Sequence, residues 1–235
     1  MFDLGTFQRQ IDFFTPSVGA PLLGDNPLVS VLFGANDIFQ GGDPVQAALD
    51  VITGIVALND LDSTLDSFLI ANLPDLSLIP DGASDPLSSA ATLAFNTTLE
   101  TGLASLESTR GLDIIRLDQA QFLQDIIDTP SVLGLTNVTD ACVQPPDPAT
   151  GFPGSNCAVT GFTSDGLPIF DVSPAENFLF LDGVHPNGTV QAAFGELAIS
   201  TLGSSAPGVV PLPASLPLML AGFGVFALAR RRKTA

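Results

Sequence analysis

The central part of the chain alternates short apolar runs with longer segments whose apolar residues recur at helical spacing. Residues 27–33, PLVSVLF, form a β-branched apolar run that predicts a buried strand ending in the polar loop GAND. Residues 43–58 have apolar positions at helical spacing, and Asp43 followed by Pro44 predicts an N-cap and a first helical turn. Residues 67–80 predict a second strand that runs into a proline-containing loop.

The same alternation continues toward the C-terminus. The further predicted elements are a helix at 85–108, a strand at 112–118, a helix at 119–128, a strand at 177–180 and a helix at 189–202. Asp85 and Pro86 are expected to open the first of these helices, and Thr189 is expected to cap the last. Strands that alternate with helices of this length predict an α/β fold with a mostly parallel sheet. Sites in such sheets lie at the carboxyl ends of the strands.

The charge of the chain excludes one class of partner. Only Arg9, Arg110 and Arg116 are basic within residues 1–229, and all 25 acidic residues lie there too, so this body carries a net charge of about −22. Phosphate contacts need clustered lysines and arginines, so we expect no nucleic-acid partner. A strongly acidic body suits an exported protein, although a merely acidic soluble surface is an alternative.

Cys142 and Cys157 are the only cysteines, and the stretch between them is rich in proline and glycine. Since no histidine lies nearby, this pair does not indicate a metal site. We expect a disulfide that closes the loop and places the body in an oxidising compartment. Two buried free thiols remain the alternative.

The C-terminal end predicts a membrane segment. Residues 214–229 are an uncharged apolar run followed at once by RRRK. Sixteen helical residues rise about 24 Å, so the run spans a hydrocarbon core of ~30 Å only marginally. The basic cluster would stay cytoplasmic, with the acidic body on the other side. The domains expected are therefore a body at 1–204, a linker at 205–213, a membrane helix at 214–229 and a basic tail at 230–235.

Residues 210–233, VPLPASLPLMLAGFGVFALARRRK, resemble the VPLPA-type C-terminal sorting signals of bacterial surface proteins. The resemblance implies export to the cell envelope or surface, transient anchoring in the inner membrane by the C-terminal helix, and cleavage by a dedicated sorting protease. An exported protein should begin with a basic and then an apolar region. The opening residues MFDLGTFQRQIDFF have neither, so we expect the natural N-terminus to lie upstream of Met1.

Two short stretches carry candidate catalytic chemistry. His185, the only histidine, follows Asp182 by three residues, a spacing at which a carboxylate can orient an imidazole and stabilise its protonated form. In GAND, Gly34 permits a close backbone approach and the Asn36 amide could donate to a developing oxyanion. A chance Asp-His pair and a simple turn are the alternatives for the two stretches.

Residues 32–37, LFGAND, and residues 179–189, LFLDGVHPNGT, resemble the third and fifth conserved blocks of the SGNH/GDSL hydrolases. The resemblance is particularly to the branch of secreted esterases and phospholipase-like haemolysins, and it covers roughly residues 5–202. It implies a three-layer α/β/α sandwich with a mostly parallel, flavodoxin-like sheet, and hydrolysis of a small-molecule or lipid ester without metal or organic cofactor. By resemblance, His185 is the base and Asp182 its acidic partner.

The same resemblance makes Asn36 the oxyanion-hole asparagine and Gly34 the glycine of its block. Asn187 stands where the family usually has threonine, a mild departure. The serious departure is that the Gly-Asp-Ser block, which supplies the nucleophilic serine on the first and central strand, is absent. GDNPL at 24–28 does not replace it, because it has Asn26 at the serine position and lies too close to Gly34.

The sequence therefore predicts a GDSL-type lipase or esterase of which this chain is an inactive fragment. On this hypothesis, the coding region upstream of Met1 holds a signal peptide and a Gly-Asp-Ser block. The alternative is a catalytically dead, surface-anchored protein that serves adhesion or matrix interaction. A third hypothesis is an acidic structural domain unrelated to hydrolases.

Overall fold

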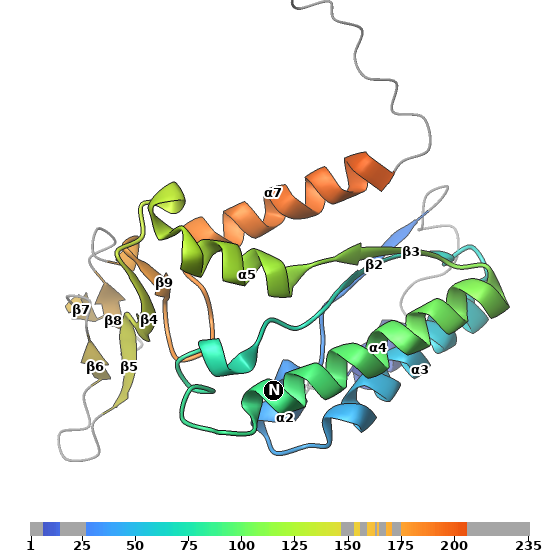
Figure 1. Cartoon of the computed structure of the whole chain (residues 1–235), viewed down its shortest axis with the longest axis horizontal. Coiled ribbons are helices and arrows are strands. Elements are labelled where there is room, and N and C mark those ends of the chain that lie inside the picture. The colour runs from blue at the N-terminus through green and yellow to red at the C-terminus, as the bar shows by residue number, and fades with distance from the viewer. Residues whose placement is uncertain are drawn as a thin grey trace, which may run out of the picture.

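The computed structural model describes residues 7–14, 27–146 and 175–205, with short pieces at 153–155, 159–162, 164 and 168–170. Three parallel strands, β1 (Leu28–Val31), β2 (Ser67–Ala71) and β3 (Asp113–Leu117), form a sheet in the order β1-β2-β3. The helices are α1 (Phe7–Phe14), α2 (Ala35–Phe39), α3 (Pro44–Leu61), α4 (Ser88–Arg110), α5 (Gln119–Asp128) and α7 (Gly188–Ser205). The predicted α/β class with mostly parallel strands is confirmed (Figure 1).

Helices cover both faces of this sheet because alternate side chains of each strand point to opposite faces. Phe68 and Ile70 of β2 are buried in a core that α3 and α4 complete. Leu69 and Ala71 pack on the other face, against side chains of α7. Figure 1 shows α3 and α4 side by side under the sheet, with α7 above it.

The edge strand β1 is covered on one face only. Val31 is buried toward α3, but Leu28 is 42% exposed, Leu32 is 48% exposed and Ser30 is exposed as well. The α7 layer covers β2 and β3 and leaves β1 open. The prediction of a buried strand at 27–33 is thus correct for one face and wrong for the other.

The start of α3 follows the predicted cap. Asp43 Oδ1 accepts hydrogen bonds from the backbone N–H groups of Val45 at 2.8 Å and Gln46 at 3.3 Å, and Pro44 occupies the first turn. The start of α4 was predicted three residues too early. Asp85 Oδ1 accepts from the N–H of Leu87 at 2.9 Å and forms a turn, after which the helix begins at Ser88.

Among the described residues, α3 is the one helix whose length and hydropathy would suit a membrane span. Its apolar side is instead built into the protein: Ala48 and Ile55 are fully buried, and α3 packs along α4. Arg110 at the end of α4 pairs with Asp60 of α3. The segment predicted to cross the membrane, 214–229, lies outside the described residues.

A second strand region lies beside the main sheet. β4 (Asn137–Ala141) pairs in parallel with β9 (Phe178–Phe180), and Asn137 lies opposite Phe178. Two antiparallel pairs that the sequence did not predict are β5 (Val143–Pro146) with β6 (Pro153–Ser155), and β7 (Val159–Phe162) with β8 (Pro168–Phe170). Short 3₁₀ turns at η2 (Leu76–Leu78) and η3 (Pro130–Leu133) complete the described elements.

Candidate functional site

The loop after β9 brings Asp182 and His185 together as the sequence predicts. Asp182 Oδ1 accepts from the backbone N–H groups of Val184 at 2.9 Å and His185 at 2.6 Å, which fixes the turn. Asp182 Oδ2 lies 2.9 Å from Nδ1 of the His185 ring. Because the His185 side chain is 70% exposed, its Nε2 edge is accessible to an incoming molecule. The pair can therefore hold an imidazole with Nδ1 protonated and Nε2 ready to accept a proton.

The pKa of the Asp182 carboxyl is below its usual value of 3.8. Burial raises this pKa, but the backbone N–H groups of His185 and Val184, together with the His185 ring, stabilise the carboxylate more strongly. The geometry and the pKa agree that Asp182 is ionised at neutral pH.

The lowered pKa of Asp182 predicts a pH dependence of stability. A carboxyl with a depressed pKa in the folded state stabilises the fold above the unfolded pKa, and the contribution is lost as pH falls through the folded pKa. We expect a ¹³C titration of the Asp182 carboxyl to report a midpoint below 3.8. His185→Ala should raise this midpoint only in part, because the backbone N–H groups remain. A midpoint at the usual value in the unsubstituted protein would contradict the described turn.

Asn187 anchors the same loop to β9 and to α7. Its side chain is 3% exposed, Nδ2 donates to the Phe178 carbonyl at 2.5 Å, and Oδ1 accepts from the Val190 N–H at 2.8 Å. Asn187 is therefore the cap of α7, and the prediction of Thr189 as the cap is wrong. Thr189 lies exposed inside the helix, two positions after the cap.

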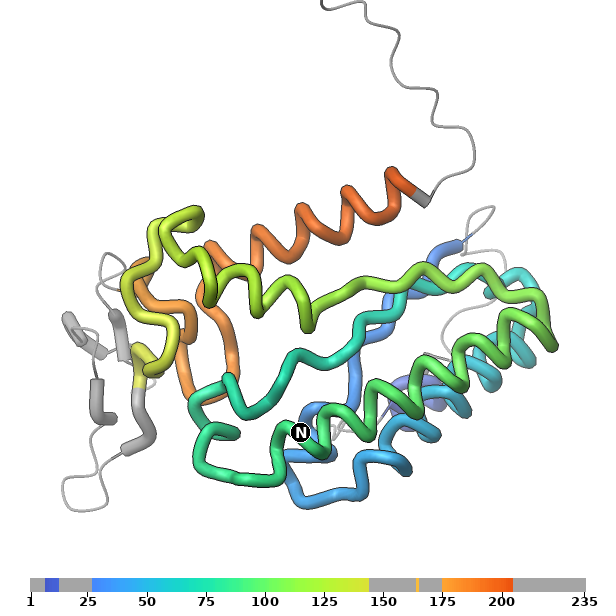
Figure 2. Tube along the Cα trace, in the orientation of Figure 1, coloured from blue at the N-terminus to red at the C-terminus, as the bar shows by residue number. Residues whose placement is uncertain are grey.

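Asp81 is a loop neighbour that sequence reasoning missed. Its backbone N–H donates to the carbonyl of Gly183 at 2.9 Å. A Cβ on Gly183 would lie only 2.0 Å from the Oδ1 atom of the Asp81 carboxylate. A side chain at 183 would have to displace this carboxylate. Asp81 and Gly183 are about a hundred residues apart, so no local pattern signals the contact; Figure 2 shows the two loops side by side.

Gly34 and Asn36 lie at the carboxyl end of β1. Gly34 has φ of 113°, and a Cβ there would lie 2.2 Å from Cε2 of the buried Phe95 ring. The turn at Gly34 starts α2, on which the Asn36 side chain is exposed. Ile38 of α2 packs against the core cluster that contains Leu179 of β9.

Ala35 of the GAND stretch thus packs on the cluster that contains Leu179 and Phe180 of β9, the strand that leads to the DGVH stretch, but no hydrogen bond joins the described residues Asn36 and His185. Within the described residues, the hydrogen bonds of the His185 side chain go to Asp182 alone. No serine, threonine or cysteine there bonds to the ring. The same residues hold no group of three or more His, Cys, Asp or Glu side chains that could bind a metal.

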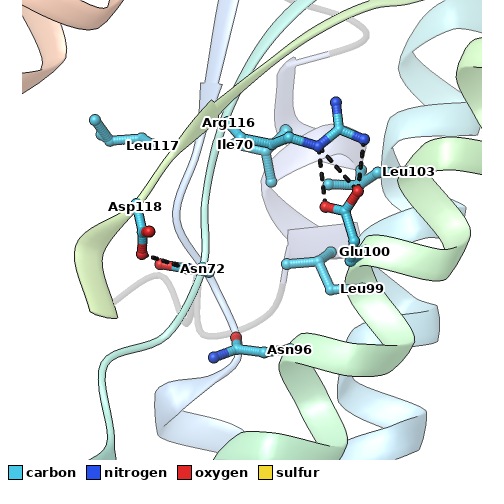
Figure 3. A pocket seen from close by; sticks show the side chains of 9 residues that line it. All are labelled: Ile70, Asn72, Asn96, Leu99, Glu100, Leu103, Arg116, Leu117 and Asp118. Carbon is cyan, nitrogen blue, oxygen red and sulfur yellow. Dashed lines mark hydrogen bonds and ion pairs between the residues drawn. The ribbon is translucent and has the colours of Figure 1, made fainter. Parts of the chain in front are cut away.

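A separate pocket of about 300 Å³ lies between β3 and α4, near the carboxyl ends of β2 and β3 (Figure 3). Its polar groups bond to one another. Arg116 donates from Nε and Nη2 to Glu100 at 2.9 Å, and from Nη1 and Nη2 to Glu107. Asn72 Nδ2 donates to Asp118 Oδ1 at 2.9 Å. These bonds tie β2, β3 and α4 together, so we interpret the pocket as structural.

The hydrogen bonds between Arg116 and its carboxylate partners favour the charged forms of Glu107 and Arg116. Hydrogen bonds from Arg116 hold the pKa of Glu107 below its usual range, and the two carboxylates raise the pKa of Arg116. Glu107 and Arg116 are therefore both charged throughout the neutral range. The ion pairs of Arg116 with Glu100 and Glu107 are partly exposed, and they hold α4 on β3.

Cys142 is buried and disulfide-bonded. Its predicted partner Cys157 lies outside the described residues, so the pairing itself stays a prediction. The backbone N–H groups of Cys142 and Val143 donate to the carbonyls of Phe180 and Leu181 at 3.0 and 2.8 Å. The cysteine is thereby attached to the strand that leads into Asp182.

Comparison with known families identifies the C-terminal end. Residues 209–233 match the family model of the PEP-CTERM protein-sorting motif. The chain carries a PEP-CTERM sorting signal. This signal is recognised by an exosortase sorting system and marks a bacterial protein that is exported, processed at the membrane and associated with the cell surface. The predicted sorting signal and export are confirmed at this level; no curated protein matches the chain.

Proposed function

We propose that this chain is the base-bearing part of an exported ester hydrolase of the SGNH/GDSL type. The observation that carries the proposal is the Asp182–His185 pair, in which the carboxylate lies 2.9 Å from Nδ1 and the ring is 70% exposed. A paired and accessible imidazole at the carboxyl end of a strand is what a hydrolytic base requires. The layered sheet with helices on both faces is compatible with the sandwich of that family.

The proposed reaction is acyl transfer to serine followed by hydrolysis. A serine hydroxyl attacks the ester carbonyl while His185 Nε2 takes its proton, and Asp182 stabilises the imidazolium that forms. The exposed amide of Asn36 would donate to the oxyanion. The imidazolium then returns the proton to the leaving alcohol, and water attacks the acyl-serine in the same way. The serine itself belongs to the Gly-Asp-Ser block that this chain lacks.

The first test measures hydrolysis of p-nitrophenyl esters by this chain. We expect equal rates for the wild-type chain and for His185→Ala, because no nucleophile in the described part of the chain bonds to the ring. The matched control is Glu196→Ala, an exposed position on α7 that lies further along the helix from His185. Hydrolysis that His185→Ala abolishes would contradict the prediction that the chain is inactive alone.

The second test uses the protein recovered from the cells that export it. If it contains a Gly-Asp-Ser block, His185→Ala is expected to lower kcat by roughly 10⁶. A fluorophosphonate probe should label the serine of that protein. Absence of both hydrolysis and labelling would refute the hydrolase proposal.

The sorting signal favours a second candidate, a surface-anchored adhesion or matrix protein without catalysis. On this alternative, the exported protein folds and reaches the surface but neither hydrolyses esters nor reacts with the probe. Retention of cells in their matrix would then be unchanged by His185→Ala and would be lost on removal of the exported body.

A further inference from the structure

The last two turns of α7 carry no charge, although they belong to a strongly acidic body. Glu196 is the last acidic residue of the chain, and no charged residue occurs between it and Arg230. The 25 acidic residues and three of the basic ones all lie at 1–196. A partner with an apolar or uncharged surface can therefore contact this end of α7 without burying a carboxylate.

One face of these two turns is used by the fold, and the other is open. Leu197 and Leu202 pack against the sheet. Ile199 is 65% exposed, and Ser200 and Gly203 beside it are exposed as well. Figure 1 shows α7 as the outer layer on its side of the sheet. The exposed residues Ile199, Ser200 and Gly203 are called the α7 end patch.

The sorting motif begins close to the α7 end patch. α7 ends at Ser205 and the residues that match the PEP-CTERM motif start at 209, so residues 206–208 alone lie between them. An extended chain spans at most about 3.6 Å per residue, so the motif starts within roughly 15 Å of Ser205. A folded domain of only 100 residues already has a radius of gyration of about 13 Å. An enzyme that holds the first residues of the motif therefore reaches the end of the body.

We propose that the α7 end patch is a contact surface for the exosortase sorting enzyme that processes the motif. Ile199 packs against an apolar surface of that enzyme, and the short connection at 206–208 keeps the two surfaces together. The enzyme thus recognises the folded body as well as the motif. The proposal does not depend on the hydrolase function.

The test measures processing of the full exported protein in the cells that make it. Pulse–chase labelling and immunoblotting give the rate at which the precursor loses its C-terminal segment. We expect Ile199→Asp to slow this step by roughly tenfold, because loss of a central apolar contact commonly weakens an interface by such a factor. An unchanged rate would overturn the proposal.

Ala192→Asp is the matched control for Ile199→Asp. It places the same charge at an exposed position of the same helix, about 10 Å from Ile199 along the axis. We expect this variant to be processed at the wild-type rate. Slowing equal to that of Ile199→Asp would mean that added charge anywhere on α7 is sufficient, and the proposal would fail.

A longer connection separates a lost contact from a damaged fold. Nine glycine and serine residues inserted after Ser205 add up to about 32 Å of reach, so the enzyme can hold the motif without meeting the α7 end patch. With this insertion, we expect Ile199→Asp and the unsubstituted protein to be processed at equal rates. If Ile199→Asp stayed slow, the substitution would act through folding and the proposal would be refuted.

The membrane surface is the alternative occupant of the α7 end patch. An apolar contact with the enzyme is disrupted by either sign of charge, so Ile199→Lys should slow processing as Ile199→Asp does. Anionic headgroups attract lysine and repel aspartate. Rapid processing of Ile199→Lys beside slow processing of Ile199→Asp would therefore assign the patch to the bilayer and overturn the proposal.

Discussion

Replacement of Gly34 by alanine is expected to lower the free energy of unfolding by roughly 2–5 kcal/mol. Two costs add in this substitution. A non-glycine residue is strained at φ of 113°, and the new Cβ would lie 2.2 Å from the fully buried Phe95 ring. Urea unfolding of the full chain, followed by circular dichroism, measures the loss.

Gly41 provides the matched control for Gly34. It also has a positive φ, 79°, but no atom lies within 4 Å of the position of its Cβ. Gly41→Ala therefore reports the backbone cost alone, and the difference between the two variants reports the contact with Phe95. In a Phe95→Ala background, Gly34→Ala should cost less than in the wild type. Equal losses for Gly34→Ala and Gly41→Ala would show that the close approach is absent.

Asn187→Ala should cost roughly 2–4 kcal/mol of unfolding free energy, because a buried side chain loses both its donor and its acceptor roles. The substitution leaves the Phe178 carbonyl and the Val190 N–H without this partner. The loop that carries His185 would then lose its side-chain link to β9, while the backbone bond from the Asn187 N–H to the Leu179 carbonyl remains. Thermal and urea unfolding measure the effect on the whole chain.

Thr189→Ala is the control that separates the observed cap of α7 from the one predicted. Thr189 is exposed, so its removal should change stability by less than about 0.5 kcal/mol. A larger loss for Thr189→Ala than for Asn187→Ala would restore the sequence-based assignment and contradict the buried hydrogen bonds of Asn187.

Local signals predicted the elements well, and they failed where a contact joins distant parts of the chain. Asp43 and Pro44 predicted the start of α3 because a cap acts within one turn. The cap of α7 was predicted at the wrong residue because Asn187 also hydrogen-bonds to β9, a contact that the sequence near the helix does not show. The exposure of Leu28 and Leu32 could not be predicted, since it depends on how far α7 extends over the sheet.

In the candidate site, too, local contacts could be predicted from the sequence and contacts between distant segments could not. The Asp182–His185 contact spans three residues, and its geometry follows from the turn. The contact of Asp81 with Gly183 is set by the fold, so only the structure reveals it. The GAND and DGVH stretches follow β1 and β9, which belong to different sheets among the described strands, so the rule that strand ends gather at one sheet edge does not by itself bring them together. The two pairs β5–β6 and β7–β8 carry many prolines and glycines, and their runs are too short to show an alternation.

The ion pairs of Arg110 and Arg116 have a consequence for behaviour in salt. Both arginines pair with carboxylates of their own chain and are already counted in the net charge of about −22, so the body still projects a strong negative field outward. Dissolved cations must compensate this field. Added electrolyte screens repulsion between whole molecules over about 10 Å at 0.1 M, whereas contacts near 3 Å are screened far less. Self-association of the exported body should therefore strengthen as ionic strength rises from millimolar to physiological levels.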